Sequence, residues 1–278
     1  MQTTSRKLGI RWTIGDVSRE GFTALELSVW GAWNLFGNNA DYAICVNSVP
    51  LHVAQQKAGT LPCEAAWHGV SGAEIPKFLR RHLGTEMAEG VAWKLAPLRM
   101  FTERFELSLD NDCILWSLPD AMRTWFDLKT AGVCLIAEDV KSCYGQYARF
   151  CGNEPRNLGI RGLPPGFDLA GALKTILHEI PVRLDSELDE QGLQLAALSL
   201  FAEPLAISLE DVAICSPFPP HLPHLGRCGA HFVGLNAHRL PWTLAGREAS
   251  DLTRESWLRL ESEVARRVKP CYTLARCA

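Results

Sequence analysis

Asp110 and Asp112 are separated by one residue, and two carboxylates at this spacing can bind a metal ion together. In an extended chain, residues i and i+2 point to the same face about 6.6–7 Å apart, so both carboxylates project together. Such oxygen donors suit Mg²⁺ or Mn²⁺, whose remaining positions phosphate and water can fill. The alternative is a solvated turn after a strand. The apolar runs at 105–109 and 113–116 argue against that turn, because they predict burial on both sides.

Two further segments carry polar side chains in apolar surroundings. His231 lies between small residues and an apolar pair, where a neutral imidazole can be held for a metal ion. The alternative for His231 is a hydrogen-bonded histidine of the core. Asn157 and Gly159, in Asn-Leu-Gly, form a second short motif whose alternative is a plain turn.

An acidic run follows Ser186, whose spacing to Asp189 is that of a helix N-cap. The run places Asp189, Glu190 and Gln191 in the first turn of a helix. Negative charge is favoured there by the helix dipole, so a structural role alone can account for it.

The elements that must position these residues follow from hydrophobic periodicity and capping. Apolar runs predict strands at 11–14, 42–46, 91–95, 105–109 and 133–137. Helices are predicted at 20–36, 75–83, 117–128 and 250–268, and after Asp168 and Ser186. Strands alternating with helices predict an α/β fold with a mostly parallel sheet covered on both faces. Ligands bind at the carboxyl ends of such strands, where Asp16, Asp110, Asp112 and Asp139 are expected.

The order of these motifs resembles a known family. In chain order the sequence has D-x-D after a strand, then N-x-G, D-E-Q-G, and H-F-x-G followed by P-W. This order resembles that of the retaining nucleotide-sugar glycosyltransferases of the GT-A fold, family 8 in particular. Segments 14–16, 27–29 and 135–139 match as well, and the resemblance covers about residues 10–243. The family has a lysine directly before its closing Pro-Trp. Here six residues separate Gly234 from Pro241 and none of them is a lysine, so Arg239 or His238 would replace it.

The resemblance implies a single GT-A-like (Rossmann-like) domain over 1–278. It implies a nucleotide-binding half at about 8–143, an acceptor-side half at about 144–245 and a C-terminal helix at about 250–268. The activity implied is transfer of a sugar from a nucleoside-diphosphate sugar, by family habit a UDP-sugar, to a hydroxyl of a glycan, lipid-linked or small-molecule acceptor, with retention. The alternative is inversion, in which Asp189 or Glu190 acts as a general base on the opposite face.

The resemblance also implies roles for individual residues. Mn²⁺ (or Mg²⁺) would be held by Asp110, Asp112 and His231. Donor contacts would come from Asp16 near the base or ribose, from Asp139 and Asn157 near the sugar, and from Gly159, Gly234 and Arg239. The reacting face would be formed by Asp189, Glu190 and Gln191.

Two other functions remain open from the sequence. His221, His224, Cys228 and His231 have a spacing that can make a four-ligand zinc site, although Pro219, Pro220 and Pro223 stiffen this stretch. A non-catalytic module that binds nucleotide sugars or glycans is the second, since the nine tryptophans offer aromatic faces for sugars. Such a module would survive loss of the metal, whereas a transferase would not.

Composition limits the class of protein. The 278 residues are 47% hydrophobic and 21% charged with a formal net charge of −3, which excludes a disordered chain and makes nucleic acid an unlikely partner. The ten cysteines form no C-x-x-C, and Cys45, Cys63, Cys113 and Cys134 lie in or beside apolar runs, as buried free thiols do. Since no signal peptide and no run of ~20 apolar residues occur, we expect a cytoplasmic protein without a transmembrane segment.

Overall fold

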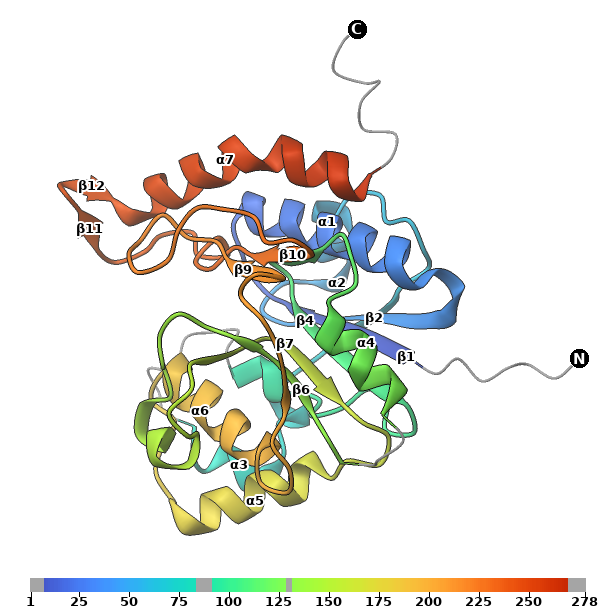
Figure 1. Cartoon of the computed structure of the whole chain (residues 1–278), viewed down its shortest axis with the longest axis vertical. Coiled ribbons are helices and arrows are strands. Elements are labelled where there is room, and N and C mark those ends of the chain that lie inside the picture. The colour runs from blue at the N-terminus through green and yellow to red at the C-terminus, as the bar shows by residue number, and fades with distance from the viewer. Residues whose placement is uncertain (1–7, 84–91, 129–131, 270–278) are drawn as a thin grey trace, which may run out of the picture.

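A seven-stranded sheet forms the centre of the computed structural model, which describes residues 8–83, 92–128 and 132–269 (Figure 1). The strand order is β3-β2-β1-β4-β7-β6-β8. Strand β7 runs antiparallel to both of its neighbours, and the other adjacent strands are parallel. The mostly parallel sheet is therefore confirmed. The strands are β1 (Leu8–Ile14), β2 (Ala40–Val46), β3 (Ala66–Gly69), β4 (Phe105–Asp110), β6 (Leu135–Glu138), β7 (Arg156–Leu163) and β8 (Leu205–Ile207).

Helices cover both faces of this sheet, as predicted (Figure 1). Alternation along β1 explains one face, because Ile10, Trp12 and Ile14 point into the same apolar cluster as helix α1. That face carries α1 (Arg19–Phe36), α2 (Leu51–Lys57) and α4 (Asp120–Asp127), and the other carries α3 (Lys77–Arg80), α5 (Leu169–Glu179) and α6 (Glu187–Leu198). Four 3₁₀ helices lie between these elements: η1 (Gly37–Asn39), η2 (Gly72–Glu74), η3 (Ala92–Leu95) and η4 (Gly145–Phe150).

A second, three-stranded sheet lies beside α1 and has the order β5-β10-β9. Its strands are β5 (Cys113–Leu115), β9 (Val212–Ile214) and β10 (Gly229–His231). The last helix, α7 (Ala249–Val268), packs across α1 and closes a third apolar cluster around Trp257 (Figure 1). It follows a hairpin of β11 (Thr243–Leu244) and β12 (Arg247–Glu248). The small sheet matters for the site because β5 continues directly from the D-x-D turn.

Two of the three predicted helix caps, those of Asp168 and Ser186, are confirmed. Asp168 accepts a hydrogen bond from the Gly171 amide at the start of α5, and Ser186 accepts one from the Asp189 amide at the start of α6. Ser117 does not cap α4. Its amide donates to the Cys228 carbonyl, which holds residue 117 against the small sheet, so the helix begins three residues later than expected.

Two predicted elements differ from the structure. The strand expected at 91–95 is wrong: residues 92–95 form η3, and residue 91 lies outside the described part of the chain. Leu95 is fully buried in the cluster under α5 and α6. The apolar run therefore correctly indicated a buried segment, but it did not distinguish a strand from a helix. The helix expected at 75–83 is limited to α3, which starts after Pro76.

The described cysteines are all free, and Cys45, Cys113 and Cys134 are buried as expected, while Cys63 is half-buried. Burial raises the pKa of the Cys134 thiol to about 12, so it is an inert part of the core. Across the described ranges, no helix combines the length and the apolar character needed to cross a bilayer.

Candidate functional site

The D-x-D turn connects β4 to β5 at the carboxyl edge of the large sheet. Asn111, in the middle of the turn, is buried and donates to the Gly21 carbonyl of α1 over 3.0 Å. Asn236 donates to Asp112 Oδ2 over 3.0 Å and to Asn111 Oδ1 over 3.1 Å. These bonds fix the turn and the direction of the Asp112 carboxylate. Asn236 was missed by the sequence analysis, although it lies in the same segment as His231.

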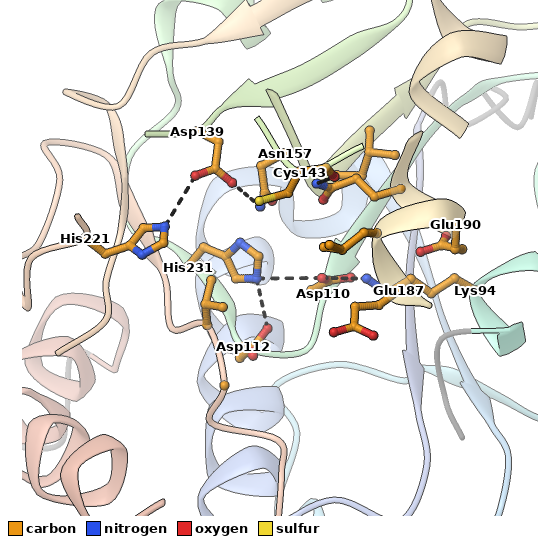
Figure 2. A pocket seen from close by; sticks show the side chains of 15 residues that line it. Lys94, Asp110, Asp112, Asp139, Cys143, Asn157, Glu187, Glu190, His221 and His231 are labelled. Carbon is orange, nitrogen blue, oxygen red and sulfur yellow. Dashed lines mark hydrogen bonds and ion pairs between the residues drawn. The ribbon is translucent and has the colours of Figure 1, made fainter. Parts of the chain in front are cut away.

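His231 reaches the turn through the pairing of the small sheet. Strand β10 is antiparallel to β5, with His231 opposite Cys113, the residue after Asp112. The amide of Phe232 then donates to the Asp112 carbonyl over 2.9 Å. As a result, His231 Nε2 lies 3.3 Å from Asp112 Oδ1 and 3.7 Å from Asp110 Oδ2 (Figure 2).

These three side chains fit a divalent cation. One ligand atom from each of Asp110, Asp112 and His231 lies within 4.8 Å of the other two, and no other such group of three occurs in the ranges that the structure describes. Asp112 Oδ1 is buried and makes no well-aligned hydrogen bond, and His231 Nε2 faces it at 3.3 Å, so with a neutral imidazole this charge is costly unless a cation binds it. Two carboxylates and one imidazole are donors that suit Mn²⁺ or Mg²⁺.

The protonation of His231 is coupled to this site. Burial disfavours its charge, but the hydrogen bond and attraction of Asp112, with Asp110, outweigh burial and raise the pKa of the imidazole above its usual value. A ligating imidazole must be neutral, so metal binding at Nε2 would release this proton.

Gly159 explains how the imidazole fits. A Cβ atom at this position would lie 2.4 Å from His231 Nδ1 and Cε1. The glycine of the N-x-G motif therefore makes room for the imidazole of His231, and Asn157 Oδ1 accepts the Gly159 amide over 2.7 Å.

Lys94 is a site residue that the sequence analysis missed. Its Nζ lies 2.8 Å from Asp110 Oδ2 (Figure 2). Burial opposes the charge of Lys94, but attraction by Asp110 and Glu190 outweighs it and raises the lysine pKa. No motif marked this lysine, because it lies in the run interpreted as a strand.

Glu190 is buried on α6, close to the same charges. Burial first, and then the charge of Asp110, raises the pKa of the Glu190 carboxyl to about 7, against the lowering influence of Lys94 and Arg161. Gln194, one helical turn later, donates to Glu190 and accepts from Arg161. Glu190 therefore titrates near neutral pH close to the Asp110 carboxylate and the Lys94 ammonium.

A cavity of about 320 Å³ connects these groups, a size found for small-molecule sites. Eight residues that the family resemblance assigned to the site line it: Asp110, Asp112, Asp139, Asn157, Glu190, Gln191, His231 and Gly234. The remaining walls are formed by Lys94, Cys143, Leu158, Glu187, Leu188, His221 and Val233.

Asp139, at the end of β6, forms the wall opposite Lys94 (Figure 2). Its Oδ2 accepts from Asn157 Nδ2 over 2.9 Å, and its Oδ1 accepts from the Val140 amide over 2.7 Å. His221 Nε2 approaches Oδ1 at 3.4 Å. The Asn157 side chain and the Val140 amide thus hold the Asp139 carboxylate in one orientation, with His221 beside it.

Four predicted residues do not line the cavity: Gly159, which lies against His231, and Asp189, Asp16 and Arg239. Asp189 accepts from the Gln146 and Asp185 amides, and these bonds outweigh burial and lower the pKa of its carboxyl, so it joins η4 to α6. Asp16 follows β1 as expected but is exposed, 3.3 Å from His238. Arg239 is exposed beside Glu248, in a separate groove with Trp242.

The four residues of the zinc alternative are not brought together. His221 contacts Asp139, and His231 contacts the D-x-D carboxylates. Cys228 Sγ donates to Asp211 Oδ1 over 3.4 Å, and His224 lies exposed on its loop. The four side chains therefore make their contacts in separate places and do not form one zinc site.

Comparisons with known proteins bear on the fold. No family model and no curated protein sequence matches the chain. The solved structure of the bifunctional glycosyltransferase WbbM is similar, with a TM-score of 0.50 and 12% identity over 96% of this chain and 52% of WbbM. The galactosyltransferase LgtC, solved with donor and acceptor sugar analogs, matches over 94% of this chain and 96% of its own, at 10% identity and a TM-score of 0.47. The chain thus has the single-domain α/β fold of the GT-A glycosyltransferases.

Proposed function

We propose that this chain is a metal-dependent glycosyltransferase. It would move a sugar from a nucleoside-diphosphate sugar, a UDP-sugar by the resemblance to family 8, to a hydroxyl acceptor with retention of configuration. The observation that carries the proposal is the convergence of ligand atoms of Asp110, Asp112 and His231 within 4.8 Å of one another at the cavity wall.

The strand order supports an arrangement for the donor. The carboxyl ends of β1, β4 and β6 and the amino end of the antiparallel β7 lie along one edge of the sheet. Asp16 after β1 would contact the base or ribose, the D-x-D turn after β4 would hold the diphosphate, and Asp139 near β7 would contact the sugar. The halves of the chain at about 8–143 and 144–245 would then bind nucleotide and acceptor, respectively.

Charge at the cavity wall supports departure of a diphosphate. A divalent cation held by Asp110, Asp112 and His231 would supply positive charge to the leaving phosphates, a contribution commonly worth several kcal/mol. Lys94 holds a second positive charge beside Asp110. Glu190 and Gln191, which line the cavity from α6, would face the reacting carbon, while Asp189 positions their helix. The free thiols among the described cysteines favour a reducing compartment, for which we propose the cytoplasm.

A ligand panel and one substitution test the proposal. Thermal shift is measured with nucleoside diphosphates and nucleotide sugars, with Mn²⁺, Mg²⁺ or EDTA, and donor hydrolysis is then followed for the best ligand. We expect Asp112→Asn to lower turnover at least ~100-fold and to remove the Mn²⁺-dependent shift, since it removes a ligand charge. The control is Asp251→Asn, on the exposed side of α7.

Each outcome has a distinct meaning. Wild-type turnover in Asp112→Asn would refute the metal role. Binding of a nucleotide sugar by the wild type without turnover towards water or any acceptor would favour the non-catalytic module. Proton NMR of the first product formed reports whether configuration is retained.

A further inference from the structure

Trp242 is an exposed tryptophan on a segment that the proposed donor site does not use. It is 41% exposed, more than any other tryptophan whose side chain the structure describes. Together with Arg239, Pro241, Thr243 and Glu248 it lines a groove of about 390 Å³, a size that suits a small ligand. An exposed apolar surface with polar residues around it is typical of a binding site.

The ring of Trp242 is held in place although it is exposed. It contacts the Phe218 ring at an angle of 64°, with the ring centroids 4.3 Å apart. The Trp242 carbonyl accepts a hydrogen bond from the Ala249 amide over 3.1 Å. Between these two residues the hairpin β11–β12 turns through Ala245 and Gly246, whose φ angles of 50° and 76° are positive, as a type I′ turn requires (Figure 1). An aromatic ring that is already fixed loses little conformational freedom when a ligand binds it.

The groove adjoins the cavity of the proposed donor site through two segments of chain. The Phe218 carbonyl accepts the His221 amide over 3.0 Å, and the His221 side chain lines the cavity (Figure 2). Gly234 lines the cavity as well, and a Cβ atom there would lie 3.7 Å from Leu240 Cδ1, two residues before Trp242. A ligand that is longer than the cavity therefore has a continuous wall to follow as far as Trp242.

The lining of the groove suits a sugar better than an acyl chain. A sugar ring has an apolar face of C–H groups, which packs on an aromatic ring, and hydroxyls at its edge, which donate and accept hydrogen bonds. Arg239 Nη2 and Glu248 Oε1 lie 3.7 Å apart in the same groove as Trp242 and offer donors and an acceptor. Because this ion pair is exposed, it stabilises the fold little, and hydroxyls can replace it at small cost. An acyl chain would take both charges out of water without replacing their hydrogen bonds.

We propose that Trp242 forms an acceptor subsite that binds one sugar ring of an oligosaccharide whose terminal sugar lies in the cavity. The inference rests on the proposed function and selects a glycan among the acceptors that the sequence left open. It agrees with retention, in which the hydroxyl reaches the anomeric carbon from the face that the diphosphate leaves. The segment that leads to Trp242 passes Gly234 only three residues after His231, on the wall that would hold the diphosphate.

The test compares acceptors that share a terminal sugar and differ in what is attached to it. Monosaccharides, linear oligosaccharides and octyl glycosides are used, each with glucose, galactose or N-acetylglucosamine at the end. Saturation-transfer NMR measures their binding in the presence of UDP and Mn²⁺. Transfer from UDP-glucose and UDP-galactose gives the kcat and KM for each acceptor, and donor hydrolysis and donor KM are measured in parallel.

The variants are Trp242→Ala, Trp242→Phe and the control Phe201→Ala. Phe201 is also an exposed aromatic residue whose ring contacts the edge of another, that of Phe167, but it lines neither the cavity nor the groove. Thermal unfolding of each variant shows whether the fold is kept.

We expect wild type to bind oligosaccharides more tightly than the matching monosaccharides. Trp242→Ala should raise the oligosaccharide KM about 10-fold, as expected for the loss of one ring-sized apolar contact, and Trp242→Phe should restore most of the affinity. The monosaccharide KM, the donor KM and donor hydrolysis should stay close to wild type, because Trp242 does not line the cavity. Phe201→Ala should match wild type throughout.

Three results would overturn the inference. A wild type that binds oligosaccharides no better than monosaccharides, or binds none of them, would exclude a second sugar subsite. A preference for octyl glycosides that is lost in Trp242→Ala would assign the groove to a lipid-linked acceptor. A raised donor KM in Trp242→Ala would place the ring at the nucleotide instead. Donor hydrolysis by wild type separates these results from failure of the proposed function, which would appear as a wild type that neither binds nor hydrolyses a nucleotide sugar.

Discussion

Glu190 combines features that rarely coexist in one side chain. It is buried, its carboxyl has a pKa of about 7, and its hydrogen bond to Gln194 connects it to Arg161. A carboxyl in this state changes charge near neutral pH beside the proposed leaving group. The physical cause is burial, reinforced by the nearby Asp110 charge.

The raised pKa predicts a pH-dependent stability. Between pH 4.5 and about 7 the folded chain keeps a proton that the unfolded chain gives up, so this carboxyl lowers stability as pH rises through that window. The shift corresponds to roughly 3 kcal/mol, at 1.36 kcal/mol per pKa unit. We expect Glu190→Gln to be more stable than wild type at pH 8 by up to about that amount, and similar near pH 5. Urea unfolding in EDTA measures the difference, and a less stable variant at pH 8 would contradict it.

Helix α6 shows how an element carries the site. Its N-terminus is fixed by Ser186 and by the two amides that donate to Asp189. Its next turn contacts η4 so closely that a Cβ at Gly192 would lie 2.1 Å from the Tyr144 carbonyl oxygen. The glycine of the D-E-Q-G motif therefore sets the distance of Glu190 and Gln191 from the cavity.

Substitution of Gly192 tests that arrangement. We expect Gly192→Ala to cost about 1–3 kcal/mol, as overpacking does, because the contact is with main chain that cannot rotate away. Since α6 must move outward, donor turnover should fall as well. Thermal unfolding and the hydrolysis assay measure the two effects. Gly69→Ala is the control, because nothing lies within 4 Å of its Cβ position, and equal behaviour of both variants would refute the packing argument.

At the scale of the whole molecule, the proposed metal site joins two layers. Asp110 and Asp112 belong to the turn leaving the large sheet, and His231 belongs to the small sheet that α7 covers. The unfolded chain has no preformed site, so a bound ion stabilises only the folded state.

Added Mn²⁺ should therefore raise the melting temperature. At 100 times the dissociation constant the stabilisation is about 2.7 kcal/mol. It should weaken as pH falls through the raised pKa of His231, because the imidazole must lose its proton to bind the ion. Calorimetry with Mn²⁺ and with EDTA at pH 6 and 8 measures this. An identical Mn²⁺ shift in Asp112→Asn would show that the ion binds elsewhere.

Much of this architecture follows from local pattern. The alternation at 105–109, the caps at Asp168 and Ser186, and the D-x-D after an apolar strand depend on neighbours within a few residues, so the sequence alone specifies them. The order of the four motifs also led to the trio of Asp110, Asp112 and His231. The strand expected at 91–95 was wrong because an apolar run records burial and leaves conformation undecided.

The tertiary structure decided which side chains meet. Pairing of β5 with β10 brings His231 to Asp112, and long-range packing brings Lys94 to Asp110 and His221 to Asp139. It also directs Arg239 and Asp189 away from the cavity. The physical reason is that these contacts depend on strand order and on loops held by distant main-chain bonds, which leave no periodic signal in the residues they connect.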